Sequence, residues 1–425
     1  MNWKKVAILG AAKTGISCAN YFSKKGADVF LSEIKQKSDV EIKNLSKNVE
    51  LEFGKHSNKI LSCDLIVPSP GISGNIPVLR AARKKGIEIL SDIEIFFLFA
   101  KYKTIIAVTG TNGKTTTVSM IGRVLDFLNC KNIVCGNIGN CVCGFIEKSD
   151  DETYICMEVS SYQLEYTKKF SPHISAILNI TPDHLHRHKT MENYINAKSK
   201  IFINQKKNDF CILNKDDQLC LELSKKCNSK IKFFSAEEYL STQNKEMLNL
   251  KIPGLHNIEN ALASIKILTA CGLSKKNITK SLSNFEGVEH RLEFVRIFNA
   301  VKYINDSKST NVSSTEVAIK SFNQPIILIL GGQDKGSPYT PLIPLIKKNV
   351  KKIIAIGEAK KKIYTQLKKS TDIILLNNIE EAVIKASKIA AKNDIVVLSP
   401  ACASFDQFKN YEERGKFFKK IVNNL

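Results

Sequence analysis

The sequence predicts an α/β protein of three domains, each built on a parallel sheet with helices between its strands. The chain has 425 residues, which is too long for one ordinary hydrophobic core and favours two or three domains. Short runs rich in β-branched residues alternate with longer amphipathic stretches, and this alternation is typical of parallel α/β layers. The runs form three series, so we expect domains over residues 1–92, 93–287 and 288–425.

The expected elements are short β-branched runs and the amphipathic stretches that separate them. In the first series, we expect strands at 6–9, 29–32 and 65–67, with a helix over 17–25. In the second series, we expect strands at 104–108, 154–158, 174–179 and 211–214, with a helix over 118–128. In the third series, we expect strands at 326–330, 352–356, 373–375 and 395–399.

Composition narrows the class of protein. Hydrophobic residues make up 43% of the chain and charged residues 24%, as in an ordinary globular protein, and no apolar run is long enough to span a bilayer. The N-terminal residues lack the apolar stretch and cleavage site of a secretory signal, so we expect a cytoplasmic protein with no membrane partner. The 12 cysteines are scattered without a Cys-x-x-Cys pair, which favours reduced thiols.

The net charge is +22, from 63 basic and 41 acidic residues, and it makes nucleic acid a partner to consider. The lysines are spread along the whole chain, however, mostly where amphipathic helices would expose them. No aromatic-basic string, zinc finger or basic heptad accompanies them. We therefore expect no nucleic-acid partner, and a positive field that would attract small anionic substrates.

The strongest local signal is the loop Thr109-Gly110-Thr111-Asn112-Gly113-Lys114-Thr115-Thr116-Thr117. It follows an expected strand and precedes an expected helix, which is the context that a phosphate-binding loop requires. Its glycines let backbone N–H groups turn toward phosphate oxygens, Lys114 can reach the outer phosphates, and the Thr115 hydroxyl can ligate Mg²⁺. Val108 stands where the full pattern has glycine. A simple glycine turn would not need the run Lys-Thr-Thr-Thr, so we interpret the loop as a nucleotide site.

A weaker glycine turn lies in the first domain. Gly10 and Gly15 follow the first expected strand, but Ala12 stands where a dinucleotide fingerprint has its second glycine. Glu33 ends the next expected strand, where an acid can face a ribose or a uracil. The pattern supports a nucleotide-like ligand. A nicotinamide oxidoreductase stays an alternative that the broken glycine pattern disfavours.

Six further strings occur in an order and spacing that resemble one enzyme family. They are 158–165 (EVSSYQLE), 179–188 (NITPDHLHRH), 254–261 (GLHNIENA), 289–293 (EHRLE), 305–311 (NDSKSTN) and 399–415 (SPACASFDQFKNYEERG). With the phosphate loop, they resemble the Mur ligase family of ATP-dependent amide-bond-forming enzymes over nearly the whole chain. The last two strings are similar to those of the family member that adds D-glutamate, whereas its sister ligases carry His-Pro, Thr-Pro or Asn-Pro at 305–311.

The resemblance implies a Rossmann-like N-terminal domain for a UDP-sugar, a central P-loop ATPase-type α/β domain for ATP, and a C-terminal Rossmann-like α/β domain for D-glutamate. It implies that UDP-N-acetylmuramoyl-L-alanine and ATP form an acyl phosphate, from which the amine of D-glutamate displaces phosphate. The implied cofactors are ATP, two Mg²⁺ ions and a CO₂-derived carbamate on Lys198. The implied partners are these small molecules, and we expect a monomer.

The resemblance also implies site residues at matching positions of this sequence. Those with catalytic or metal-binding roles are Lys114, Thr115, Glu158, His184 and carbamylated Lys198. Those for ATP are Gly110, Thr111, Asn112, Gly113, Lys114, Thr115, Thr116, Asn260, Arg291 and Asp306. Those for the UDP-sugar are Lys13, Thr14, Glu33, Ser69, Asn137, Gln163 and His184. Those for D-glutamate are Lys308, Thr310, Lys335, Ser404 and Tyr411, where the family often has Phe in place of Tyr411.

Several alternatives stay open. Lys200 competes with Lys198 as the carbamylated lysine, although the register from His184 favours Lys198. His184, His186 and His188 could line one side of an extended zinc-binding segment, but no zincin pattern surrounds them, and the family has Asp in place of His186. Another amino-acid ligase, such as folylpolyglutamate synthetase, would not need a uridine pocket. A nucleotide-dependent nucleic-acid-binding protein would explain the charge.

Overall fold

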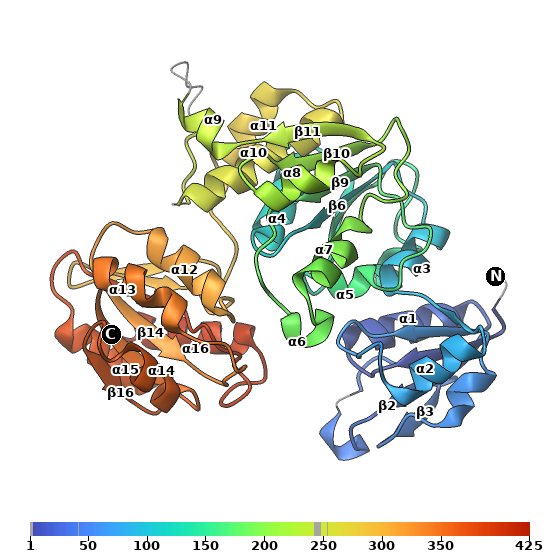
Figure 1. Ribbon diagram of the computed structural model, residues 1–425, viewed down its shortest axis with the longest axis horizontal. Coiled ribbons are helices and arrows are strands. Elements are labelled where there is room, and N and C mark those ends of the chain that lie inside the picture. The colour runs from blue at the N-terminus through green and yellow to red at the C-terminus, as the bar shows by residue number, and fades with distance from the viewer. Residues whose placement is uncertain (1–2, 41, 242–247, 253) are drawn as a thin grey trace. The chain divides into compact units, whose positions relative to one another are not determined.

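A computed structural model of the protein describes residues 3–40, 42–241, 248–252 and 254–425, except for the side chain of His186 (Figure 1). The chain divides into two compact units, one of Met1–Leu248 with Glu259–Ser283 and one of Asn249–Ile258 with Asn284–Leu425. The first unit holds two sheets and the second unit holds a third. The three sheets confirm the predicted three-domain α/β class, and the exact domain bounds stay predictions.

The N-terminal sheet has five parallel strands in the order β3-β2-β1-β4-β5. Its strands are β1 (Lys5–Leu9), β2 (Asp28–Glu33), β3 (Glu50–Phe53), β4 (Leu65–Pro68) and β5 (Glu88–Ile89). Its helices are α1 (Lys13–Lys24), α2 (Pro77–Lys84) and α3 (Asp92–Phe99), with 3₁₀ turns η1 (Lys37–Asp39) and η2 (Asn58–Ser62). The three predicted strands are confirmed. Helix α1 begins at Lys13 rather than at residue 17, and its Gly15 packs so closely against the Gly10 carbonyl that a Cβ atom there would clash.

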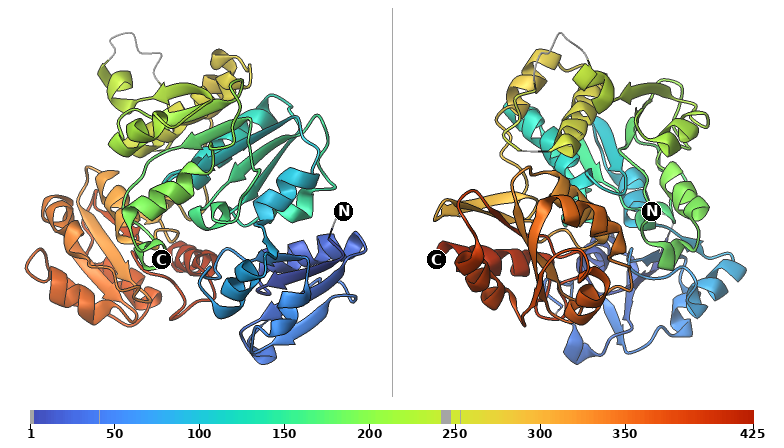
Figure 2. Two further views of the ribbon diagram at one scale, coloured as in Figure 1. Left: turned by 45° about the vertical axis from the view of Figure 1, so that its right-hand side comes forward. Right: turned by 60° about the vertical axis from the view of Figure 1, so that its left-hand side comes forward.

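The central sheet has six parallel strands in the order β11-β10-β9-β6-β8-β7. Its strands are β6 (Thr104–Thr109), β7 (Asn132–Gly136), β8 (Tyr154–Glu158), β9 (Ile174–Ile177), β10 (Phe210–Asn214) and β11 (Lys230–Phe234). The helices are α4 (Lys114–Phe127), η3 (Val142–Phe145), α5 (Ser161–Leu164), α6 (Leu185–His188), α7 (Met191–Ser199), α8 (Gln218–Ser224), α9 (Ala236–Ser241), α10 (Leu255–Ala270) and α11 (Lys275–Leu282). Figure 2 shows helices on both faces of this sheet, so residues 105–108 of β6 are apolar and fully buried.

The third sheet has six strands in the order β12-β13-β17-β14-β15-β16. Its strands are β12 (Glu293–Phe298), β13 (Val301–Asn305), β14 (Ile326–Gly331), β15 (Val350–Ile356), β16 (Ile373–Leu375) and β17 (Ile395–Leu398). Its helices are α12 (Val312–Lys320), η4 (Thr340–Leu342), α13 (Ile343–Asn349), α14 (Lys360–Leu367), α15 (Ile379–Ile389) and α16 (Tyr411–Asn423). Five of these strands pair in parallel, as the predicted α/β layers require, and the edge strand β12 is an addition that the sequence did not predict. Strand β12 runs antiparallel to β13 because Asn299 and Ala300, both with positive φ, close a two-residue hairpin.

In each sheet, a central strand lies between two parallel neighbours. Strand β1 lies between β2 and β4, β6 between β9 and β8, and β17 between β13 and β14. The loops that follow the carboxyl ends of such strands meet at one edge of the sheet, and ligands of open α/β sheets bind at this edge. Most of the predicted site residues end or follow these central strands or their immediate neighbours. No helix among the described residues is long and apolar enough to cross a membrane.

Candidate active site

The phosphate loop joins the end of β6 to the start of α4. Gly110 and Gly113 have φ values of +151° and +85°, which residues with a side chain rarely adopt. A Cβ atom on Gly113 would lie 2.3 Å from Oδ1 of Asn260, so the loop also needs glycine there for space. The backbone N–H of Asn112 donates to Oδ1 of Asn179 at 2.8 Å, which fastens the loop beyond the end of β9. These constraints fix the bend of the loop in front of the α4 N-terminus.

Two lysine side chains meet at the carbonyl oxygen of Gly110. Nζ of Lys114 donates to this oxygen at 2.8 Å and to that of Thr111 at 2.7 Å. Nζ of Lys198, from α7, donates to the same Gly110 oxygen at 2.8 Å. Lys198 is only 2% exposed, and burial together with the charge of Lys114 lowers its pKa well below the ordinary value. Lys198 therefore becomes a neutral amine more readily than a surface lysine does.

A hydroxyl and a carboxylate lie together behind the loop. Oγ1 of Thr115 donates to Oε2 of Glu158 at 2.8 Å, and Nδ2 of Asn137 donates to Oε1 of the same carboxylate at 2.9 Å. Glu158 ends strand β8 and is 2% exposed, so both its oxygens are oriented by neighbours. A hydroxyl beside a carboxylate is an oxygen donor set that Mg²⁺ prefers. These residues therefore fit the divalent cation that accompanies a bound nucleoside triphosphate.

His184 lies before α6 with a left-handed backbone, at φ +56°. Its side chain is 42% exposed, and its Nε2 lies 3.5 Å from a carboxylate oxygen of Asp183. The centroid of its ring lies 4.9 Å from that of Tyr162 and 6.5 Å from that of Tyr194. Nζ of Lys198 lies 4.7 Å from the same Tyr194 ring. The structure thus brings His184 and Lys198 to one tyrosine that the sequence did not single out.

The structure contradicts the alternative in which His184, His186 and His188 line an extended zinc-binding segment. Residues 185–188 form the helical turn α6, and no group of three or more His, Cys, Asp or Glu among the described residues could hold a metal ion. His188 is buried, and its Nε2 lies 3.0 Å from Oγ of Ser161, which indicates a structural role. The side chain of His186 lies outside the described part of the structure.

Lys200, the alternative to Lys198, is engaged elsewhere. Its Nζ donates to the carbonyl oxygen of Glu165 at 2.7 Å. The carboxylate of Glu165 in turn binds the guanidinium of Arg187, with Nη2 2.7 Å from Oε2. In the described part of the chain, Lys198 contacts the phosphate loop and Lys200 does not, which favours Lys198 as the functional lysine.

The predicted UDP-sugar residues of the first domain follow three adjacent strands. Lys13 and Thr14 form the first turn of α1, directly after β1. Glu33 ends β2, and its Oε2 accepts a hydrogen bond of 2.8 Å from the backbone N–H of Ala11. Ser69 follows β4. The carboxyl ends of β1, β2 and β4 therefore bring these residues to one edge of the sheet.

Gln163 is less accessible than its predicted contact with the UDP-sugar would require, since it is 3% exposed. Its Nε2 donates to both carboxylate oxygens of Asp92, at 3.0 and 3.2 Å, and its Oε1 accepts from the Ser160 N–H at 3.1 Å. Burial raises the pKa of Asp92 to about 6 despite the hydrogen bonds from Gln163. The sequence predicted a boundary at Asp92 but carried no signal for its burial, because Gln163 lies 71 residues away.

The predicted D-glutamate residues follow three adjacent strands of the third sheet. Lys308 and Thr310 follow β13, Ser404 follows β17, and Lys335 follows β14, while Tyr411 begins α16. Nζ of Lys308 lies 5.3 Å from the centroid of the Tyr411 ring. Two cations and two hydroxyl groups on neighbouring loops suit a dicarboxylate.

Arg291 and Asp306 lie in the same unit as these loops. Asp306 is 1% exposed and accepts hydrogen bonds from Ser399 Oγ at 2.9 Å, from the Ser309 hydroxyl and from the Leu292 N–H at 3.2 Å. Burial raises the pKa of Asp306, and the charge of Arg291 opposes this effect. Nε of Arg291 is buried without a hydrogen-bond partner among the described residues, and so is Nδ2 of Asn260 in the first unit. Such unpaired donors are expected where a ligand completes a site.

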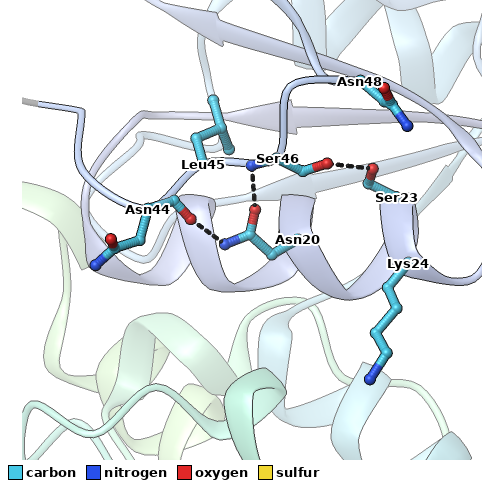
Figure 3. A pocket seen from close by; sticks show the side chains of 7 residues that line it. All are labelled: Asn20, Ser23, Lys24, Asn44, Leu45, Ser46 and Asn48. Atoms are coloured by element: carbon cyan, nitrogen blue, oxygen red, sulfur yellow. Dashed lines mark hydrogen bonds between the residues drawn. The ribbon is translucent and has the colours of Figure 1, made fainter.

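A separate cavity of about 480 Å³ lies beside α1 (Figure 3). Its seven lining residues are Asn20, Ser23, Lys24, Asn44, Leu45, Ser46 and Asn48. Both ends of the Asn20 amide are used, since Nδ2 donates to the Asn44 carbonyl at 2.7 Å and Oδ1 accepts from the Ser46 N–H at 2.8 Å. The cavity contains no predicted site residue, and its polar groups hold the local chain together.

The fold and the phosphate loop define a class, namely nucleotide-dependent enzymes with three α/β domains, and comparison with known proteins refines it. Three family models match the chain. They are described as "Mur ligase MurD-like, N-terminal domain" over residues 4–91, "Mur ligase middle domain" over 108–268 and "Mur ligase, glutamate ligase domain" over 290–402.

Similar proteins include UDP-N-acetylmuramoylalanine--D-glutamate ligases from Clostridioides difficile and Elusimicrobium minutum. They are 40% and 42% identical to the chain, and the matches cover 99% of the chain and 99% and 98% of those proteins. The chain belongs to the Mur ligase family, in its branch of UDP-N-acetylmuramoylalanine--D-glutamate ligases. The predicted family and branch are thereby confirmed, and membership implies the use of ATP with Mg²⁺.

Solved structures of related proteins share the fold. A UDP-N-acetylmuramate-alanine ligase from Thermotoga maritima and a type C pseudomurein peptide ligase from Methanothermus fervidus both superpose with a TM-score of 0.61. They are 19% and 18% identical to the chain, and each match covers 99% of both chains. Because the sequence identity is below 20%, these comparisons support the three-domain fold alone.

Proposed function

We propose that the chain forms an amide between the alanyl carboxylate of UDP-N-acetylmuramoyl-L-alanine and the amine of D-glutamate, with ATP as the energy source. The observation that carries the proposal is the pair of ammonium groups, from Lys114 and Lys198, on one carbonyl of the phosphate loop. The names of relatives about 40% identical over 99% of the chain support the choice of substrates.

The reaction has two steps. The alanyl carboxylate attacks the γ-phosphorus of ATP, the bond to ADP breaks, and an acyl phosphate forms. The amine of D-glutamate then attacks the acyl carbon and loses a proton, and phosphate leaves with the electrons of the C–O bond. Lys114 neutralises charge on the phosphoryl oxygens while they change partners. Such a reaction depends mainly on positioning and charge neutralisation, which buried, oriented groups supply.

Thr115 and Glu158 would hold one Mg²⁺, and Glu158, His184 and modified Lys198 would hold a second. The bound ions would supply further charge neutralisation for the phosphoryl oxygens. Support comes from the 2.8 Å hydrogen bond between the Thr115 hydroxyl and the Glu158 carboxylate. Asn137 keeps the other carboxylate oxygen in place, so it acts as a positioning residue in this proposal.

Lys198 would act as a carbamate. Its neutral amine attacks the carbon of CO₂, an N–C bond forms and a proton leaves, which turns a cation into an anionic oxygen donor. The burial of Lys198 and the neighbouring Lys114 charge favour the neutral amine that this step needs. Lys114 would then pair with the carbamate rather than repel an ammonium group.

The remaining site residues are assigned to the three substrates by the chemistry of their side chains. Lys13, Thr14, Glu33 and Ser69 would bind the uridine diphosphate, with Asn137 and His184 nearer the sugar and the alanyl group, whereas the buried Gln163 would support the site through Asp92. Lys308, Thr310, Lys335, Ser404 and Tyr411 would bind D-glutamate. Asn260, Arg291 and Asp306 would bind ATP, and their unpaired or buried polar atoms support this assignment. The monomeric state and the cytoplasmic location stay predictions of the sequence.

The test is ATP-dependent phosphate release with UDP-N-acetylmuramoyl-L-alanine and one amino acid at a time. D-glutamate, L-glutamate, meso-diaminopimelate and L-lysine are compared, and the product is identified by mass. Release with D-glutamate alone, with the matching product, is expected. Turnover with another amino acid would retain the ligase chemistry and overturn the assignment of the third domain.

A further inference from the structure

Arg414 is a buried cation in the third domain, on the first turns of α16. It is 2% exposed, and its guanidinium uses all five of its N–H donors. Nε donates to Ser307 Oγ at 3.0 Å, Nη1 donates to the carbonyls of Cys402 and Ala403 at 3.2 and 3.1 Å, and Nη2 donates to those of Ser307 and Cys402 at 2.8 and 3.2 Å. Arg414 therefore joins two loops that lie about a hundred residues apart in the sequence.

Each of these loops carries a predicted D-glutamate residue next to the anchored backbone. Ser307 precedes Lys308, and Ala403 precedes Ser404. Ser307 also donates its Oγ to the carbonyl oxygen of Tyr411 at 2.8 Å, so the start of α16 is tied to the same point. A change in the Arg414 contacts would thus alter the spacing of three groups that would bind the amino acid.

The third loop of the pocket is joined to the other two through Tyr339. Its hydroxyl lies 2.9 Å from Sγ of Cys402 and 3.4 Å from Oδ1 of Asp334. Asp334 precedes Lys335 and is held by Lys362, whose Nζ donates to both carboxylate oxygens at 2.8 and 3.1 Å. The bonds therefore run from Arg414 through Cys402 and Tyr339 to the residue beside Lys335.

The Arg414 charge is not paired with an acid. Among the described residues, no carboxylate oxygen lies within the 4.0 Å of an ion pair with its guanidinium, and its acceptors are three carbonyls and one hydroxyl. Burial lowers the pKa of Arg414 to about 10, so it stays charged at neutral pH. The charges of Asp406 and Asp306 also favour the protonated guanidinium, although neither carboxylate forms an ion pair with it.

We propose that Arg414 is the positioning residue of the amino-acid pocket: its guanidinium sets the spacing of the loops that carry Lys308 and Ser404 without touching the substrate. Tyr339 connects these two loops to the loop that carries Lys335. The proposal deepens the proposed function, because it concerns the pocket that the amino-acid substrate would occupy. Lysine cannot replace Arg414, since its single ammonium group cannot bridge carbonyls in a fixed planar fork.

The test compares Arg414→Lys with Arg296→Lys in the full chain. Arg296 is a matched control, because its guanidinium also donates to backbone carbonyls of α16, those of Val422 and Asn423, at 3.4 and 2.9 Å. In Arg414→Lys, the KM for the amino acid should rise about tenfold or more, while the KM values for ATP and the UDP-sugar stay within about twofold. Arg296→Lys should change none of the three. An unchanged KM for the amino acid, or an equal rise in all three KM values, would overturn the proposal.

Amide hydrogen exchange of the substrate-free protein gives a second readout that needs no turnover. Arg414→Lys should speed exchange in segments 307–310 and 401–404, and wild-type protection in both would overturn the proposal. Should Arg414→Lys fail to fold, Tyr339→Phe removes only a hydroxyl and should raise the KM for the amino acid selectively, by about two- to fivefold. An unchanged KM for the amino acid in Tyr339→Phe would also contradict the proposal. If the wild type uses an amino acid other than D-glutamate, the proposed function fails, and the KM comparison is made with that amino acid.

Discussion

Lys114 and Lys198 both donate to the carbonyl oxygen of Gly110 at 2.8 Å, although they lie 84 positions apart in the sequence. Two ammonium groups at one acceptor repel each other, and the burial of Lys198 increases the cost of its charge. The arrangement is unfavourable for the free protein unless one of the two amines changes its charge. A carbamate on Lys198, or a polyphosphate on the loop, would each relieve the repulsion.

The first prediction concerns Lys198 in α7 and Lys200 at the C-terminal end of the same helix. Lys198→Ala should lower turnover by about 100-fold or more, because the variant lacks the amine that would become a metal-binding carbamate. Lys200→Ala should stay within a fewfold of the wild type, since Lys200 binds the Glu165 carbonyl instead. Phosphate release in the presence of bicarbonate measures both. Full activity of Lys198→Ala would remove Lys198 from the mechanism.

The Thr115–Glu158 pair gives the second prediction. Thr115→Val removes the hydroxyl and leaves a side chain of the same shape, so the affinity for Mn²⁺ in the presence of ATP should fall by about 10-fold or more. Thr115→Ser keeps the hydroxyl and should retain most of that affinity. Electron paramagnetic resonance of Mn²⁺ reports the binding directly. Equal affinities of the valine and serine variants would show that the hydroxyl is no ligand.

Gly113 gives the third prediction. Gly113→Ala should abolish tight ATP binding, because the new Cβ would lie 2.3 Å from Asn260 Oδ1 and would deform the loop. Gly272 is a matched control, with φ +83° against +85° and no atom within 4 Å of an added Cβ. Gly272→Ala should cost only the backbone strain, about 1 kcal/mol, and should bind ATP normally. Titration calorimetry and thermal unfolding separate the two effects, and normal ATP binding by Gly113→Ala would contradict the space argument.

Asp92 gives the fourth prediction, which concerns stability. Burial raises its pKa from 3.8 in the unfolded chain to about 6 in the folded one. A carboxyl group with a raised folded pKa contributes stability that is fully present below pH 4 and is lost as pH rises through about 6. Relative to Asp92→Asn, which cannot ionise, the wild type should therefore lose roughly 3 kcal/mol between pH 4 and pH 7. Thermal unfolding of both proteins across this range measures the difference, and parallel pH profiles would disprove it.

Much of the fold was predictable from local patterns. The buried strands at 105–108 and 154–158 are short β-branched or apolar runs between helices, and such runs carry a strong signal when both faces of a sheet are covered. Strand β12 was missed because it lies at the edge of the sheet, where its residues are half-buried or exposed without a regular alternation. The hairpin that makes it antiparallel depends on Asn299 and Ala300, and alanine is a residue that sequence rules do not expect at positive φ.

The candidate site was predictable only in part. The phosphate loop is a contiguous string, so its residues could be named from the sequence alone, and the resemblance supplied Glu158 and Lys198. Tyr194 and Arg414 were not singled out, because their roles depend on neighbours far away in the chain: the Tyr194 hydroxyl lies 3.1 Å from that of Thr111, and Arg414 binds Ser307. A single sequence contains no local pattern for such contacts.

The sequence by itself determined the three α/β domains, the phosphate loop, the family and the residue types that would meet ATP and the substrates. These features are encoded by short-range periodicity and by contiguous motifs. Only the tertiary structure decided that Lys198 rather than Lys200 contacts the phosphate loop. It also decided that the Gln163 amide binds the Asp92 carboxylate, and that Arg414 connects two loops of the third domain through hydrogen bonds. The physical reason is that burial, pKa and hydrogen-bond partners depend on which distant segments the sheets bring side by side.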